Sequence, residues 1–114
     1  MDATKIENRR IGDANEAAHL ARVKTEIIRT LKAHLNVSAY RCFFFGSRVE
    51  GTHRERSDID VGILGSAPLT LEKLFEIKDA MERIPTLFKI DVVDFMRARR
   101  DFRAVALEHT EEIR

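Results

Sequence analysis

The sequence predicts a small α/β or α+β domain in which helices pack on a small sheet. Two kinds of pattern indicate this class. Large apolar residues recur every three or four positions over residues 16–35 and 70–84, which is the period of an amphipathic helix. Three short apolar runs, at 40–45, 59–64 and 88–95, are bounded by turn residues or polar segments and are typical of strands.

Length and charge limit the possible functions. The chain has 114 residues, which fits one domain, and its net charge of +1 does not indicate nucleic-acid binding. Its longest apolar run, Cys42–Phe45, is far short of the roughly 20 residues that cross a bilayer, so no membrane span is expected. The single cysteine and the polar start of the chain predict no disulfide and no secretory leader. A cytoplasmic location is therefore expected.

The first predicted element is a helix. Residues 1–14 contain only Ile6 and Ile11 as large aliphatic residues and show no period, so a loose N-terminal tail is expected there. The remaining residues, 15–114, are expected to form a single domain. The apolar stripe of the first helix consists of Leu20, Val23, Ile27, Leu31 and Leu35.

Two strands follow this helix. The first, Tyr40–Phe45, ends at Gly46-Ser47, and a polar stretch leads to the second, Ile59–Leu64. In the second strand the apolar side chains alternate with Asp58, Asp60 and Gly62, so these two groups of residues are expected on opposite faces.

The remaining predicted elements are a helix, a third strand and a final helix. The whole domain is therefore expected to have a sheet of about three strands and about four helices, one of which is a short helix or loop after residue 46. Thr70–Ile84 is predicted as a helix with Thr70 as N-cap, and Phe88–Phe95 as the third strand. A final helix, at about Arg99–Glu108, is expected to turn Phe102, Val105 and Ala106 inward.

Acidic residues inside these strands are the unusual feature of the sequence. A helical crossover joins the second and third strands, which predicts that they are parallel neighbours. Asp58 and Asp60 would then lie beside Asp91. Three carboxylates at this spacing repel one another, and oxygen-only ligands favour Mg²⁺ or Mn²⁺ over zinc. The alternative is that Asp58 is an exposed residue at a strand start and the other two pair with arginines.

The segment before these acids points to a phosphate ligand. Ten residues separate Ser47 from Asp58. Gly46 lets the chain turn sharply and lets backbone N–H groups approach a phosphate, the Ser47 hydroxyl can donate a hydrogen bond, and Arg48 adds charge. A glycine, a serine and an arginine in succession are also common in a plain turn. A Walker A loop is excluded because Thr52 stands where its lysine is required.

The segment GSRVEGTHRERSDIDVGI (residues 46–63), followed by Asp91 in KIDVVDF, resembles the nucleotidyltransferases of the polymerase β superfamily. More narrowly, it resembles the minimal nucleotidyltransferases (MNT) that are encoded with HEPN-domain proteins. The resemblance covers about residues 16–108 and rests on the Gly-Ser-x10-Asp-x-Asp pattern. It implies a minimal polymerase β-like fold.

The resemblance also implies a role for each motif residue. Asp58, Asp60 and Asp91 correspond to metal ligands, and Asp91 is also expected to activate the attacking hydroxyl. Gly46 and Ser47 correspond to the pair that holds the nucleoside triphosphate, with Arg48 as a secondary candidate. Two Mg²⁺ ions would promote in-line attack on the α-phosphorus and release of pyrophosphate.

The implied activity is Mg²⁺-dependent transfer of a nucleotide, AMP from ATP, to a hydroxyl. The implied acceptor is a tyrosine of a cognate HEPN toxin, so the protein would act as an antitoxin within a hetero-oligomer. One alternative is a non-catalytic antitoxin that neutralises its HEPN partner by binding alone. Another is transfer to a small molecule. Larger relatives carry an additional acceptor-binding domain that does not fit in this chain, so the acceptor site is expected on the partner.

The end of the chain departs from the family pattern. Many relatives finish with a short apolar, strand-like segment, whereas this chain ends in the polar sequence EHTEEIR. The structure of this edge, and how a partner packs there, are therefore left open.

Overall fold

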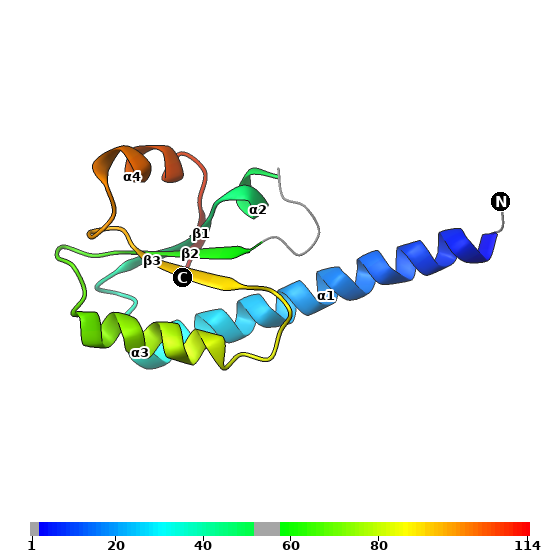
Figure 1. The fold of residues 1–114 in the computed structure, drawn as a ribbon, viewed down its shortest axis with the longest axis horizontal. Helices are drawn as coiled ribbons and strands as arrows, with labels where there is room; N and C mark the ends of the chain where they lie inside the picture. The colour runs from blue at the N-terminus through cyan, green and yellow to red at the C-terminus, as the bar shows by residue number, and fades with distance from the viewer. Residues whose placement is uncertain (1–2, 52–57) are drawn as a thin grey trace.

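A four-stranded mixed sheet lies at the centre of the computed structural model, with strand order β3–β2–β1–β4 (Figure 1). The structure describes residues 3–51 and 58–114, without the side chains of residues 3–14 and Ser47. The elements in chain order are α1 (Ala3–His34), β1 (Arg41–Phe45), α2 (Ser47–Glu50), β2 (Ile59–Leu64), α3 (Leu71–Glu82), β3 (Ile90–Asp94), α4 (Arg100–Ala106) and β4 (Glu111–Ile113).

The sheet contains both antiparallel and parallel strand pairs. β1 is antiparallel to β2 and to β4, whereas β2 and β3 are parallel and are joined through α3. This confirms the parallel pairing expected from a helical crossover. In the register, Phe45 lies opposite Asp60, and Asp60 lies opposite Asp91. The amino-terminal ends of β2 and β3 therefore meet at the same edge of the sheet.

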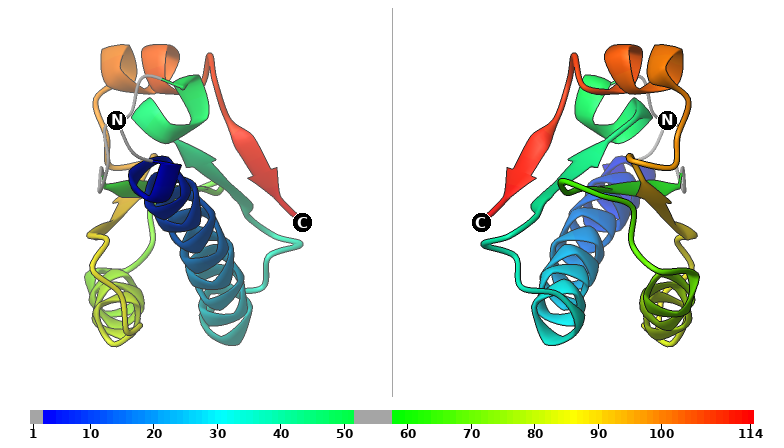
Figure 2. Two further views of the ribbon diagram at one scale, coloured as in Figure 1. Left: turned by 90° about the vertical axis from the view of Figure 1, so that its right-hand side faces the viewer. Right: turned by 90° about the vertical axis from the view of Figure 1, so that its left-hand side faces the viewer.

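Helices cover the two faces of the sheet unequally. The long helices α1 and α3 lie side by side on one face, and the short helices α2 and α4 lie on the other (Figure 2). The part of α1 nearest the N-terminus extends well past the sheet (Figure 1). The face that carries α2 and α4 therefore has far less helix over it than the opposite face.

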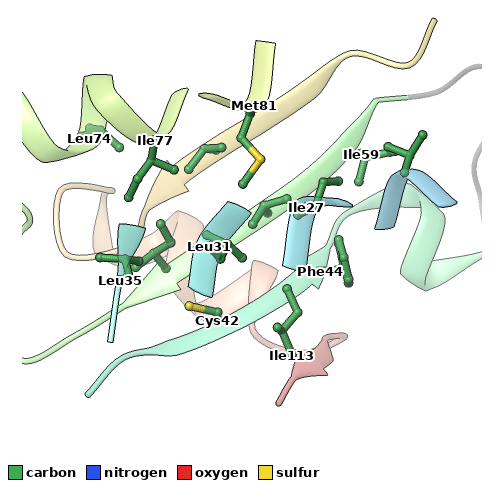
Figure 3. Close-up of a cluster of buried hydrophobic side chains, with 14 of the residues drawn as sticks. Ile27, Leu31, Leu35, Cys42, Phe44, Ile59, Leu74, Ile77, Met81 and Ile113 are labelled. Atoms are coloured by element: carbon green, nitrogen blue, oxygen red, sulfur yellow. The ribbon is translucent and has the colours of Figure 1, made fainter. Parts of the chain in front are cut away.

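The main hydrophobic core fills the space between the sheet and the two long helices. Side chains of α1 and α3 meet those of the sheet there, and Figure 3 shows Ile27 of α1 between Leu31 of the same helix and Ile59 of β2. Ile59, Val61 and Ile63 are all nearly inaccessible to solvent, as the alternation of β2 predicted. The helix α3 begins where expected, because the side chain of Thr70 accepts a hydrogen bond from the N–H of Lys73 at 3.1 Å.

A second, aromatic cluster lies on the opposite face of the sheet. Phe43, Phe45 and Phe95 are buried there, with ring centroids 4.9–6.0 Å apart, and Ala106 of α4 packs against them. Gly62 makes this packing possible, because a Cβ atom at that position would collide with the ring of Phe43 and lie 2.9 Å from Phe95. The rings of Phe43 and Phe95 thus fill the space that a side chain at position 62 would occupy.

Two features of the fold differ from the sequence-based expectation. The expected loose tail at residues 1–14 is wrong for residues 3–14, because α1 is continuous from Ala3. The polar end of the chain, which the sequence left open, forms β4, and its pairing with β1 gives the sheet four strands where about three were expected. Arg41 holds β4 in place, with Nε 2.6 Å from Oε1 of Glu112.

Within residues 3–51 and 58–114, no helix is both long enough and apolar enough to cross a bilayer.

Candidate active site

The paired aspartates lie at the start of β2. Asp58 immediately precedes the strand and is exposed, whereas Asp60 is the second residue of the strand and is half-buried. Strand alternation turns Asp60 away from the core between the sheet and the long helices, since Ile59 and Val61 occupy that core. Asp60 therefore belongs to the sheet face that carries α2 and α4.

The third acid, Asp91, is the direct partner of Asp60 on the neighbouring strand. Both residues occupy the same register position of the parallel pair, so their side chains leave the same face of the sheet. Asp91 is half-buried as well. The structure thus brings together Asp60 and Asp91 from segments about thirty residues apart, as the sequence predicted.

The pKa of Asp60 reflects both its burial and the neighbouring acids. Burial, followed by the negative charges of Asp91 and Asp58, raises the pKa of Asp60 from 3.8 to about 6. Lys89 acts in the opposite direction and lowers this pKa. Ionisation of Asp60 is therefore less favourable than that of an ordinary aspartate, and a positive group beside the three carboxylates would favour it.

Gly46 provides the turn from β1 into the short helix α2. Its φ of +84° lies in the left-handed region that favours glycine, and its carbonyl oxygen accepts hydrogen bonds from the N–H groups of Val49 and Glu50 at 3.1 Å. A Cβ atom at Gly46 would collide with Oδ2 of Asp60. The glycine of the Gly-Ser pair is therefore in contact with the Asp-x-Asp motif across the β1–β2 pair.

Ser47 and Arg48 are the other predicted nucleotide-binding residues. Ser47 is the first residue of α2, and its hydroxyl lies outside the described part of the structure. The guanidinium of Arg48 lies over the ring of Phe88, 4.6 Å from its centroid, and His19 of α1 stacks on the same ring. Arg48 therefore anchors α2 to the segment that leads into β3, in addition to any contact with a ligand.

A cavity of about 310 Å³ opens over the acids. Its polar lining comes from Glu50, Asp60 and Asp91, and Gly46 borders it at the end of β1. This volume is at the lower end of the range for small-molecule sites, which is roughly 300–1,000 Å³. The sequence did not single out Glu50, which lies in the polar stretch after β1 with no motif of its own.

The rest of the cavity lining is apolar and comes from Phe45 and Val93 of the strands and from α4. On α4, Phe102 and Val105 line it, with 44% and 64% of their surfaces exposed. The expectation that α4 turns its apolar side chains inward is wrong for Val105 and holds in part for Phe102, whose ring contacts the aromatic cluster on one side; Ala106 packs against that cluster as expected. The helical period showed which residues share a face of α4, but it did not show that this face borders an open cavity.

The acids suit a hard divalent cation by their chemistry, since carboxylate oxygens are the ligands that Mg²⁺ prefers. A cation would also relieve the repulsion that raises the pKa of Asp60. Among the side chains that the structure describes, no three acidic, histidine or cysteine groups are arranged as a finished metal site. The two halves of the motif thus form an acidic, oxygen-rich cleft.

A mixed sheet with paired acids on adjacent strands, beside a glycine turn and a cavity, is typical of a nucleotidyl-transfer domain. The chain matches the family "Polymerase beta, Nucleotidyltransferase" over residues 25–113. It belongs to this family, which confirms the resemblance seen in the sequence. A curated relative is the probable protein adenylyltransferase MntA of Haemophilus influenzae, which is 30% identical over 79 residues, covering 69% of this chain and 68% of the relative.

Solved structures share the fold. A toxin–antitoxin complex with AMP-PNP contains a chain that superimposes with a TM-score of 0.64 at 21% identity, covering 79% of this chain and 71% of that one. The MNT antitoxin structure with tri-AMPylated HEPN toxin from Shewanella oneidensis gives a TM-score of 0.62 at 17% identity, covering 82% and 71%. These matches extend over most of both chains and confirm the polymerase β-like fold.

Proposed function

We propose that this protein transfers AMP from ATP to a tyrosine hydroxyl of a HEPN-domain toxin, and that it acts as the antitoxin of that partner. The observation that carries the proposal is the side-by-side placement of Asp60 and Asp91 on parallel strands, with Gly46 in contact with Asp60. The relative named as a probable protein adenylyltransferase and the complex with an AMPylated HEPN toxin support this choice of donor and acceptor. The proposal includes a cytoplasmic location, because ATP is the donor.

The roles of the residues follow from their positions. Asp58, Asp60 and Asp91 would hold Mg²⁺, which when bound neutralises the phosphates and polarises the α-phosphorus. Gly46 and Ser47 receive the triphosphate at the turn into α2, and Arg48 fixes this turn against Phe88. Asp91, on the far side of Asp60 from Gly46, accepts the proton of the attacking hydroxyl. The attack forms a phosphodiester to the acceptor oxygen and expels pyrophosphate.

The test uses the complex with a HEPN-domain partner encoded beside this chain. With Mg²⁺ and ATP, intact-mass spectrometry of the partner should show a gain of one or more AMP units. Asp91→Asn should abolish this gain, and replacing the acceptor tyrosine of the partner by phenylalanine should do the same. Asp79→Asn, on the exposed surface of α3, is the matched control and should leave the transfer unchanged.

The competing function, neutralisation by binding alone, predicts a different result. In that case Asp91→Asn protects cells from the toxin as well as the wild type does, and no AMP adduct forms. That outcome would contradict the enzymatic proposal and leave the family assignment intact.

A further inference from the structure

The face of the sheet that carries the acids is divided into a covered part and an open part. Phe45, Asp60 and Asp91 lie side by side in one row across three strands, and Phe43, Gly62 and Val93 form the next row. Ala106 of α4 packs on the aromatic cluster that includes Phe43. The row that contains the acids is bordered by α4 and forms the floor of the cavity.

Phe102 has an unusual environment for an aromatic side chain. Its ring lies 6.1 Å from the ring of Phe45 and 5.7 Å from that of Phe95, between centroids, so two buried rings support it. Nevertheless 44% of the residue is exposed, and Val105, one turn further along α4, is exposed over 64%. An aromatic ring that is held in place on one side and open to a cavity on the other is suited to stacking against a flat ligand.

The geometry of nucleotidyl transfer indicates which part of the ligand would reach this surface. The attacking and leaving oxygens lie on one line through the reacting phosphorus. With the triphosphate at Gly46 beside β1 and the acceptor at Asp91 on β3, this line runs across the strands, over Asp60 on β2. The oxygen that links the phosphorus to the nucleoside lies at a large angle to the line. The wall formed by α4 borders the cavity to the side of this line, which is where the nucleoside would extend.

We propose that Phe102 and Val105 form the binding surface for the base of the nucleoside triphosphate, with the base stacked on the ring of Phe102. This inference rests on the proposed function, because it uses the positions assigned there to the triphosphate and the acceptor. The ligand class is a purine ring, whose large flat face fits an aromatic ring beside an aliphatic side chain. The acceptor or another surface of the partner is the competing occupant, and the experiment separates the two.

The chain contains no tryptophan, so one introduced residue provides a specific fluorescent probe. The variant is Phe102→Trp, which keeps a ring against Phe45 and Phe95. The matched control is Phe75→Trp, at a phenylalanine of α3 that is 61% exposed. Both proteins are titrated with Mg²⁺-ATP and with Mg²⁺-tripolyphosphate, and calorimetry of the wild type measures binding of the same two ligands independently.

The expected result is a saturable change in tryptophan emission of Phe102→Trp with ATP, absent with tripolyphosphate and absent in Phe75→Trp. Phe102→Ala should weaken ATP binding about tenfold and leave tripolyphosphate binding unchanged, in line with the loss of one base–aromatic stack. An unchanged emission of Phe102→Trp at ATP concentrations that saturate the protein by calorimetry overturns the inference, as does an equal response to tripolyphosphate. If the wild type binds no ATP, the proposed function fails as well, and calorimetry identifies that case.

Discussion

Gly46 and Asp60 approach each other so closely that the glycine has no room for a β-carbon beside the carboxylate. The two residues belong to the two halves of the nucleotidyltransferase motif, one at the end of β1 and one in β2, and they lie on adjacent strands. Two separate requirements thus fall on Gly46. Its backbone has a positive φ, and its Cα hydrogens face a metal-ligand candidate.

The first prediction concerns Gly46→Ala. A positive φ costs an alanine about 1 kcal/mol, and here the new methyl group must also displace the carboxylate of Asp60. We expect loss of Mg²⁺-dependent ATP binding by calorimetry, together with a lower melting temperature. Gly51→Ala is the matched control, because Gly51 has a φ of +78° and, among the described residues other than its chain neighbours, no atom lies within 4 Å of its added Cβ.

Gly51→Ala should reduce stability through backbone strain alone and retain ATP binding. Equal effects of the two substitutions on ATP affinity would show that the contact between Gly46 and Asp60 does not contribute to ATP binding.

The second prediction concerns Asp60→Asn and pH. The pKa of Asp60 is raised in the folded state, so ionisation of this group destabilises the fold as pH rises through about 6. The asparagine variant should be more stable than the wild type at pH 8 by about 1 kcal/mol, a value reduced for the partial exposure of the group. This gain should vanish near pH 4, where the wild-type carboxyl is protonated in the folded state.

The same variant should lose the stabilisation by Mg²⁺-ATP. Thermal melts at pH 4, 6 and 8, with and without ligand at pH 8, measure both effects. An asparagine variant that is less stable than the wild type at pH 8, or that retains the full shift with Mg²⁺-ATP, would mean that Asp60 has a structural role instead.

The third prediction distinguishes Asp94 from the acids of the site. Its buried carboxylate accepts hydrogen bonds from the N–H groups of Leu69 at 2.8 Å and Met96 at 3.0 Å, and only 5% of the residue is exposed. Asp94→Ala leaves these donors unpaired and should cost about 2–3 kcal/mol of stability. Asp79→Ala, which removes an exposed ion pair with Arg83, should cost less than about 0.5 kcal/mol.

Chemical denaturation of the two variants measures this difference. A cost for Asp94→Ala no larger than for Asp79→Ala would exclude a structural role for the Asp94 carboxylate.

The fourth prediction concerns the edge strand β4. The hydrogen bond from Arg41 lowers the pKa of Glu112, so this group stabilises the fold above its ordinary pKa, and the contribution is lost as pH falls below about 4.5. Glu112→Gln should reduce stability by about 0.5 kcal/mol at pH 7, because the pair is partly exposed. At pH 3 the variant and the wild type should be equally stable. A difference that is the same at both pH values would show that the charge of Glu112 is irrelevant.

Much of the fold was predictable because local patterns determine it. The bounds of β2 agree with the predicted strand, and Thr70 caps α3 as expected. Alternation in β2 and the helical crossover to β3 together placed Asp60 and Asp91 side by side, which the register confirms. The roles of these acids in binding metal remain a prediction.

The features that sequence patterns missed depend on contacts between distant segments. β4 contains two glutamates and only one apolar residue, and it becomes a strand because β1 offers a free edge and Arg41 pairs with Glu112. The early turns of α1 lack an apolar period, which is the signal used to detect a helix. Phe102 and Val105 have that period, but the pattern contains no information on which neighbour covers them.

Gly62 shows how a residue outside the motif can affect the reaction. Phe43 and Phe95 occupy the space above it, and α4 rests on the cluster that includes these rings. Any side chain at this position would push the rings outward and tilt the helix that borders the cavity. With the base on α4 as proposed, a substitution at Gly62 would therefore alter nucleotide binding from beneath the aromatic cluster, through the position of the helix.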